Sequence, residues 1–272
     1  MTLLPQSIWL ASVDSTNRAL ADMVARDPGL ADWTTIAAEE QTAGRGRLDH
    51  RWISPRGRNI ACSILVRADV PAERLATLPL LAGLAVVRAV AKTDAATGVG
   101  LSIKWPNDVW HGDRKLCGIL CEIPPEKTGA DPDSQSRETG TGPVFSGVTA
   151  IVGIGVNVNL QAEEIPGPVR QTATSLALAS GREWDLRLLL EDLRAELYAL
   201  CAEWKKRGLS PFLAELRKRD MLLGREFSVE AGNAVERGTG AGIADDGSLL
   251  LRNESGEIVS VFAGDIHVAG IS

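Results

Sequence analysis

The sequence contains few cysteines, few aromatic residues and no excess of basic residues. Its 272 residues include 4% aromatic residues and four cysteines, Cys62, Cys117, Cys121 and Cys201. So few cysteines, at irregular spacing, cannot form a disulfide framework or a paired CxxC zinc site, and we expect a reducing compartment. The pair in "CGILC" could bind a metal, but it lies in an apolar run where cysteine packs as a small hydrophobe. We therefore assign no metal to it, and any metal site stays unknown.

The charge balance and the distribution of apolar residues exclude two further classes of protein. The net charge is -6 and the pI is about 5.3, whereas affinity for a phosphate backbone requires a basic excess. The N-terminal stretch "MTLLPQSIWLASVD" lacks a basic segment followed by a long apolar one, and no later segment has about 18 uninterrupted apolar residues. We expect a soluble cytoplasmic protein that binds neither DNA nor membranes, as a monomer or weak dimer.

Residue periodicity predicts an α+β fold. Asp14 and Ser15 are candidate N-caps for a short helix that ends before "PGL", and the segment 75–93 is apolar almost all round, as in a helix buried against a sheet. Strands are expected where β-branched and apolar residues concentrate, at 34–40, 58–68, 101–110, 114–123 and 149–160. Helices and strands alternate irregularly, which favours α+β over a doubly wound sheet.

The second half of the chain shows an insertion, a long helix and a change of character. The segment 124–147 is rich in Pro, Gly, Ser and charge, so we interpret it as a mobile surface insertion. From Leu186, apolar residues at spacings of three and four predict a helix that ends near Gly208. After Met221, four short strands between turns predict a small β-barrel at 222–272, and a larger domain at 1–221.

The segment "GRGR" predicts an anion site between two strands. Its glycines permit close approach, and Arg45 and Arg47 offer forked donors that match carboxylate or phosphate. Gly-Arg pairs also occur in solvated turns and in nucleic-acid-binding tails, so this segment needs the support of others.

Two further segments supply that support. In "KWPNDVWHGDRKLCGIL", Pro106 interrupts strand pairing and presents Asn107 and Asp108 at the sheet edge, with Lys104 and Lys115 on either side of the carboxylate. In "GIGVNVN", glycines admit a flat ligand whose polar edge asparagine amides can bind, although the spacing is not that of a dinucleotide fingerprint. The alternatives are an Asn-Asp turn with surface lysines and a glycine-bearing core strand.

Together, "STN", "EEQTAGRGR", "KWPND", "RKLCGIL" and "GIGVNVN", in this order, resemble the catalytic core of biotin protein ligases. The resemblance runs from about Ser15 to Asn159, and the small C-terminal β domain is similar to the family's SH3-like appendage. It implies a mixed sheet like that of class II aminoacyl-tRNA synthetases. It also implies the use of ATP, biotin and Mg²⁺: biotin is activated to biotinyl-5'-AMP and passed to a lysine of a biotin carboxyl carrier domain of acyl-CoA carboxylases.

The resemblance assigns roles to named residues. Arg45, Arg47 and Lys115 would stabilise the charge of adenylation, and the loop that carries Arg45 and Arg47 would close over the intermediate. Asp108 would orient or deprotonate the carrier lysine. The implied biotin contacts are Ser15, Thr16, Asn17, Gln41, Gly44, Arg45, Gly46, Arg47, Lys115, Gly118, Gly153 and Gly155. The implied ATP and adenylate contacts are Arg47, Trp52, Asn107, Lys115 and Asn157.

Other interpretations remain open at this level. About 14 residues precede "STN", too few for the DNA-binding domain of the bifunctional members, so we expect a monofunctional ligase. A lipoate ligase is the nearest enzyme alternative, because it also activates a carboxylate with ATP and loads a carrier lysine. A nucleic-acid-binding module that uses "GRGR" and the barrel is a different class, which the acidic balance disfavours.

Overall fold

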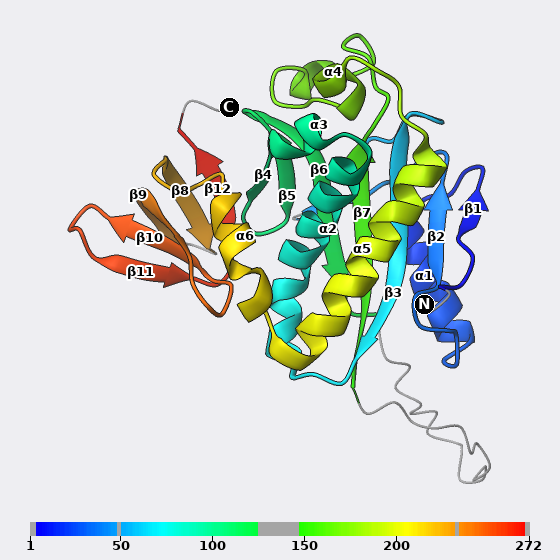
Figure 1. Cartoon of the computed structure of the whole chain (residues 1–272), viewed down its shortest axis with the longest axis horizontal. Helices are drawn as coiled ribbons and strands as arrows, with labels where there is room; N and C mark the ends of the chain where they lie inside the picture. The colour runs from blue at the N-terminus through cyan, green and yellow to red at the C-terminus, as the bar shows by residue number, and fades with distance from the viewer. Residues whose placement is uncertain (1–3, 48–49, 125–146, 232–233, 270–272) are drawn as a thin grey trace.

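The computed structural model describes residues 4–47, 50–124, 147–231 and 234–269, and places two sheets side by side (Figure 1). The larger sheet has the order β1-β2-β3-β7-β6-β5-β4. Strands β1 and β2 are parallel and all other neighbours are antiparallel, so the sheet is mixed. Its strands are β1 (Ile8–Leu10), β2 (Thr35–Ala38), β3 (Asn59–Ala68), β4 (Leu101–Lys104), β5 (Asp108–His111), β6 (Arg114–Glu122) and β7 (Val148–Asn157).

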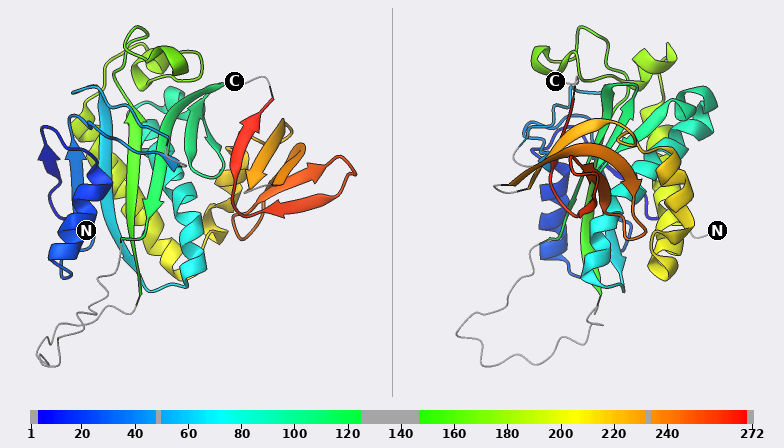
Figure 2. Two further views of the ribbon diagram at one scale, coloured as in Figure 1. Left: turned by 180° about the vertical axis from the view of Figure 1, so that it is seen from behind. Right: turned by 90° about the vertical axis from the view of Figure 1, so that its left-hand side faces the viewer.

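Alternation of side chains along β3 gives the sheet two buried faces. Ile64 and Val66 join the main core, whereas Leu65 between them packs with Leu20 of α1 (Thr16–Arg26) on the opposite face. The main core lies under α2 (Leu78–Thr93) and α5 (Leu186–Arg207), and Figure 2 shows α1 alone on the other side of the sheet. Shorter helices are α3 (Ala95–Val99), α4 (Leu176–Ser180) and α6 (Leu213–Lys218).

The two long core helices follow from their sequences. Helix α5 buries one stripe that includes Leu193, Leu197 and Trp204, and Gly208 ends it at a φ of 62°, so the predicted end is confirmed. The helical segment Ala72–Thr93 is apolar and long enough to cross a membrane, but it is buried in the core. Its first six residues, Ala72–Thr77, are a 3₁₀ helix, so the α-helix begins at Leu78 and not at the predicted residue 75.

The second sheet forms the expected small β domain. It has the antiparallel order β11-β10-β9-β8-β12, from β8 (Glu226–Ala231), β9 (Ala234–Ile243), β10 (Leu249–Asn253), β11 (Ile258–Val261) and β12 (Asp265–Val268). The predicted fold class, a mixed sheet with helices plus a C-terminal β domain, is confirmed. The division into 1–221 and 222–272 stays a prediction.

Two details differ from the sequence-based expectations, and a third cannot be compared. The segment 101–110 was expected as one strand, which is wrong: a turn at Trp105–Asn107 splits it into β4 and β5, because Pro106 cannot donate to a ladder. Strands β1 and β12 were not predicted, since three or four residues are too few to show a period. The predicted insertion 124–147 lies outside the described residues except for its two ends.

Candidate active site

Glycines open a cavity on the face of the sheet that carries α1. Positions 151, 153 and 155 of β7 point to this face, where Ile151 packs against α1 but Gly153 and Gly155 have no side chain. Gly118 of β6 pairs with Gly155 across the ladder. The floor of the cavity, whose volume is about 140 Å³, is therefore backbone.

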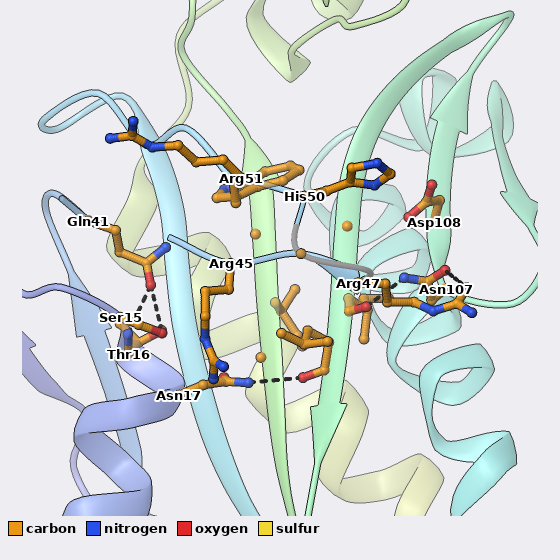
Figure 3. A pocket seen from close by; sticks show the side chains of 18 of the residues that line it. Ser15, Thr16, Asn17, Gln41, Arg45, Arg47, His50, Arg51, Asn107 and Asp108 are labelled. Atoms are coloured by element: carbon orange, nitrogen blue, oxygen red, sulfur yellow. Dashed lines mark hydrogen bonds between the residues drawn. The ribbon is translucent and has the colours of Figure 1, made fainter. Parts of the chain in front are cut away.

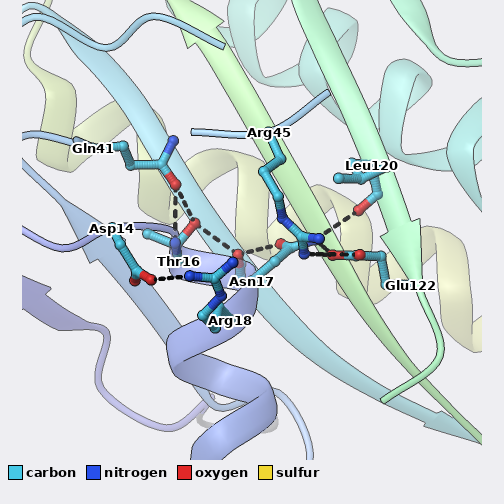
Figure 4. Close-up of polar contacts among 9 residues, drawn as sticks. Asp14, Thr16, Asn17, Arg18, Gln41, Arg45, Leu120 and Glu122 are labelled. Atoms are coloured by element: carbon cyan, nitrogen blue, oxygen red, sulfur yellow. Dashed lines mark hydrogen bonds and ion pairs between the residues drawn. The ribbon is translucent and has the colours of Figure 1, made fainter. Parts of the chain in front are cut away.

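A network of polar side chains closes one end of this cavity at the N-terminus of α1. The Gln41 Oε1 atom accepts from the backbone N–H and the hydroxyl of Thr16, at 2.9 and 3.1 Å. The Ser63 hydroxyl of β3 donates to the Asn17 Oδ1 atom at 2.5 Å and lies 2.8 Å from the Thr16 hydroxyl. Figure 4 shows the network, whose members come from three separate segments. Its amides and hydroxyls can bind a small ligand that both donates and accepts hydrogen bonds.

Each arginine of "GRGR" already has a polar partner. Arg45 donates from Nη2 to both oxygens of Glu122, each at 2.9 Å, and Glu122 also accepts from the Asn17 amide at 2.6 Å. Arg47 donates to Asn107 Oδ1 at 3.3 Å and to the carbonyl of Gly264 at 3.1 Å. The second contact links the loop to the C-terminal domain, and Figure 3 shows Arg47 beside Asn107.

A carboxylate and a lysine line the opposite end of the cavity, and a second lysine, Lys104, lies near them. The Lys115 ammonium is 2.8 Å from Asp108 Oδ2, while Asp108 Oδ1 is buried with no hydrogen-bond partner among the described residues. Burial lowers the pKa of Lys104, the Lys115 cation adds to this effect, and Asp108 and Asp265 oppose it. This end therefore combines a close ion pair with a carboxylate oxygen that has no hydrogen-bond partner among the described residues.

Trp52 separates this cavity from a second one. Its indole lies directly over Gly155 and Gly118. A Cβ atom at Gly155 would lie 2.4 Å from Trp52 Cε2, and a Cβ atom at Gly118 would lie 3.1 Å from Trp52 Cζ3. The second cavity, about 380 Å³, is lined by Trp52, Lys115 and Asn157 together with several apolar residues. The apolar wall is Ile53, Leu160, Ile165, Pro166, Val169 and Ala173.

The predicted site residues come together in one region. The first cavity is lined by Ser15, Thr16, Asn17, Gln41, Arg45, Gly46, Arg47, Trp52, Asn107, Asp108, Lys115, Gly118, Gly153 and Gly155. Gly44 lines an outer cavity beneath the same loop, and Asn157 lines the second cavity. The space expected at Gly153 for a ligand is filled by Asn17, whose Oδ1 would lie 2.3 Å from a Cβ there.

Known proteins resemble this chain in both of its parts. The model of the Biotin/lipoate A/B protein ligase family matches residues 9–130, and that of the Biotin protein ligase C terminal domain matches residues 222–268. The chain is 32% identical over 253 residues to the Biotin--[acetyl-CoA-carboxylase] ligase of Paracoccus denitrificans, covering 92% of this chain and 95% of that protein. This chain belongs to the biotin protein ligases. Its activity is that of an ATP-dependent ligase.

Other biotin protein ligases extend the comparison. The biotin protein ligase of Aquifex aeolicus in complex with biotin and ATP superposes with a TM-score of 0.76 at 28% identity, over 97% of this chain and 98% of that one. The bifunctional ligase/repressor BirA of Bacillus spizizenii is 31% identical over 235 residues. The match covers 86% of this chain, which spans 66% of that relative's length.

Sequence reasoning missed several residues of this biotin protein ligase site. Arg51 lines both cavities, Glu122 holds Arg45 and Asn17, and Asp265 of β12 lines the first cavity. Arg51 lies four residues after "EEQTAGRGR" and Glu122 two residues after "RKLCGIL", so their charge was a usable signal. Asp265 lies 150 residues after Lys115 in the sequence, and only the tertiary structure brings it to the site.

Proposed function

We propose that this chain joins biotin to ATP, giving biotinyl-5'-AMP and pyrophosphate, and then transfers biotin to a lysine of a biotin carboxyl carrier domain of an acyl-CoA carboxylase. The observation that carries the proposal is the single cavity in which the polar network at Thr16 and Gln41 faces Arg45, Arg47 and Lys115. Adenylation joins two anions, and such a cavity can bind a polar ring at one end and neutralise the anions at the other.

The biotin end of the proposed site is the network at the N-terminus of α1. Ser15, Thr16, Asn17 and Gln41 supply donors and acceptors for a ureido ring, and Gly118, Gly153 and Gly155 keep the floor low. Ser15 is the N-cap of α1 but makes no capping bond from its side chain, which leaves the hydroxyl for a ligand. On binding, Arg45 would exchange part of its contact with Glu122 for the biotin carboxylate.

The nucleotide end of the proposed site is the second cavity. Its apolar wall suits an adenine ring, with Trp52 as the stacking partner and Asn157 as a polar contact. Lys115 lines both cavities, so it is placed where the α-phosphate must meet the carboxylate. Arg47, now held by Asn107, would turn to the phosphates and help to exclude water from the mixed anhydride.

Mg²⁺ would accompany ATP. Among residues 4–47, 50–124, 147–231 and 234–269, no three His, Cys, Asp or Glu side chains gather as a metal-binding group. This fits an ion bound mainly by phosphates and water, for which Asp108, with one free oxygen, offers a carboxylate. The bound ion would neutralise phosphate charge.

Asp108 is also our candidate for orienting or deprotonating the carrier lysine in the transfer step. Lys115 now occupies its Oδ2 atom, so contact with phosphate would free this carboxylate for the amine. Four free cysteines fit a reducing compartment, and we place the reaction in the cytoplasm.

The proposal predicts the behaviour of biotin-dependent ATP–pyrophosphate exchange. We expect Arg47→Ala to lower the exchange rate about 100-fold, since it removes a cation from developing negative charge. Arg56→Ala is the matched control, because Arg56 is an exposed arginine of the same segment that pairs with Glu39 and does not line the cavity. Exchange by Arg47→Ala at the wild-type rate, with the adenylate retained equally well, would remove Arg47 from the site.

The substrate is tested separately, because the matching family model also covers lipoate ligases. Labelled biotin or lipoate is incubated with the chain, ATP and a biotin carboxyl carrier domain. We expect label only from biotin, and loading of lipoate alone would contradict the proposal.

A further inference from the structure

Strand β12 of the C-terminal domain is held against the catalytic cavity by two cations of the larger domain. Arg47 donates to the carbonyl of Gly264 at 3.1 Å, and Lys104 donates to the carbonyl of Ile266 at 2.8 Å. Asp265 lies between these two fixed carbonyls, and it lines the first cavity together with Asp108. Figure 2 shows β12 beside the β4–β5 hairpin. The position of the Asp265 carboxylate is therefore set by contacts between the two domains.

The backbone at Gly264, directly before Asp265, lies very close to strand β8. Gly264 has a φ of 155°, and a Cβ there would lie 2.5 Å from Val229 Cγ1. No other residue fits at this point without displacing β8, so the approach of Asp265 to the cavity is built into the β domain.

The charges of the cavity suit the first half-reaction but oppose the second. Arg45, Arg47, Arg51 and Lys115 line it, and they attract phosphate and carboxylate. A carrier lysine arrives as an ammonium, which these cations repel. The transfer step therefore needs a carboxylate near the cavity that the cations do not already neutralise.

Asp265 meets this need better than Asp108 does. Asp108 is paired with Lys115 at 2.8 Å and its side chain is 13% exposed. The Asp265 side chain is 34% exposed, and its one ion pair among the described residues is with His267, at 3.9 Å from Nε2 to Oδ2. Lys104 also attracts Asp265 but forms no ion pair with it. A partly exposed carboxylate without a close ionic partner remains free to attract an incoming ammonium.

We propose that Asp265 receives the ε-ammonium of the carrier lysine as it enters the cavity and directs it to the adenylate. The proposal rests on the function proposed above. The ammonium gives one proton to Asp108, and the amine then attacks the acyl carbon of biotinyl-5'-AMP. The C–N bond forms, the C–O bond to phosphate breaks with its electron pair leaving on AMP, and a second proton passes from nitrogen to water. Asp265 makes contact before these steps and exchanges no proton.

The two half-reactions of an Asp265→Asn variant test the proposal. Asparagine keeps the side-chain oxygen that accepts from the Ile266 N–H at 3.2 Å, so the variant removes charge without removing this contact. We expect biotin-dependent ATP–pyrophosphate exchange within about twofold of wild type, and kcat/KM for the carrier in transfer from preformed enzyme-bound adenylate reduced about tenfold. Glu257→Gln, which removes an exposed charge elsewhere in the same domain, should leave both reactions unchanged.

An uncharged nucleophile separates recognition of the ammonium from a structural effect. Hydroxylamine, which is uncharged at neutral pH, should consume the bound adenylate at the same rate in wild type and Asp265→Asn. Raising the ionic strength should bring carrier transfer by wild type toward the variant's rate. Equal losses with hydroxylamine and carrier, or a loss of exchange that extra Mg²⁺ restores, would overturn the role of Asp265. Absence of exchange in wild type would instead overturn the proposed function.

Discussion

At the scale of single residues, the absence of side chains on β7 matters as much as the charged groups around it. A methyl group at position 153 would lie 2.3 Å from Asn17 Oδ1, and one at position 155 would lie 2.4 Å from Trp52 Cε2. The sequence indicated glycines that admit a ligand. The structure shows that the side chains of Asn17 and Trp52 occupy this space. Both residues are ligand contacts in the proposed function.

We expect Gly153→Ala to weaken biotin binding at least tenfold. The new methyl group must displace the Asn17 carboxamide, which breaks its contacts with Ser63 and Glu122, and a lost hydrogen bond to a charged group costs about 1.5–3 kcal/mol. Isothermal titration calorimetry measures the effect. Gly167→Ala is the control, because a Cβ at Gly167 meets no atom within 4 Å. Wild-type affinity in Gly153→Ala would show that the position of Asn17 does not matter for biotin.

At the scale of helices and strands, the layer between the sheet and α5 explains the chemistry of the cysteines. Cys62 of β3 and Cys201 of α5 are buried in the main core, and burial raises the pKa of each thiol from 9.0 to about 12. Burial also raises the pKa of Cys117 of β6. These positions are typical of packing residues and not of reactive thiols.

The raised pKa values predict a loss of stability in alkaline solution. Above about pH 9 the unfolded chain releases thiol protons that the folded chain keeps, so the free energy of unfolding falls as the pH rises toward 12. Urea unfolding from pH 8 to pH 11 measures the slope. We expect a shallower slope for Cys201→Ala, which lacks one such thiol, and an identical slope would assign the effect to other groups.

Predictability differed among the elements for physical reasons. Helix α5 was predicted from start to end because its stripe repeats over several turns and Gly208 stops it. The sequence predicted β4 and β5 as one strand, because Pro106 was interpreted as an interruption within it. In the structure the chain reverses direction at Pro106, and β5 pairs antiparallel with β4. Strand β12 has only four residues, so its pairing partner β8, and not its own sequence, defines it.

At the scale of the whole molecule, the two sheets share one hydrophobic core. Ile243, Leu249 and Leu251 of the C-terminal sheet belong to the same buried cluster as Leu80 of α2. The Trp105 indole donates to the carbonyl of Gly247 at 3.0 Å across this junction. We therefore expect both parts to unfold in a single cooperative transition.

The Trp105 contact gives a direct test of this coupling. We expect Trp105→Phe to lower the free energy of unfolding by about 1–3 kcal/mol more than Trp110→Phe, because it leaves a buried carbonyl unpaired. Trp110 is the matched control, being a buried tryptophan whose indole N–H has no partner among the described residues. Urea unfolding followed by fluorescence and circular dichroism measures both variants. Equal losses, or separate transitions for the two sheets, would contradict the coupling.

The sequence by itself determined the family, the α+β class and most of the residues that gather around the cavity. The sequence could determine these features because binding a given ligand requires particular residue types at fixed spacing, and such short motifs can be recognised in the sequence alone. Only the tertiary structure decided that Glu122 holds Arg45, that Trp52 separates two cavities, and that β12 brings Asp265 beside the β4–β5 turn. These contacts join segments that are distant in sequence, and they depend on strand register and on the docking of the two sheets, which no local pattern of residues encodes.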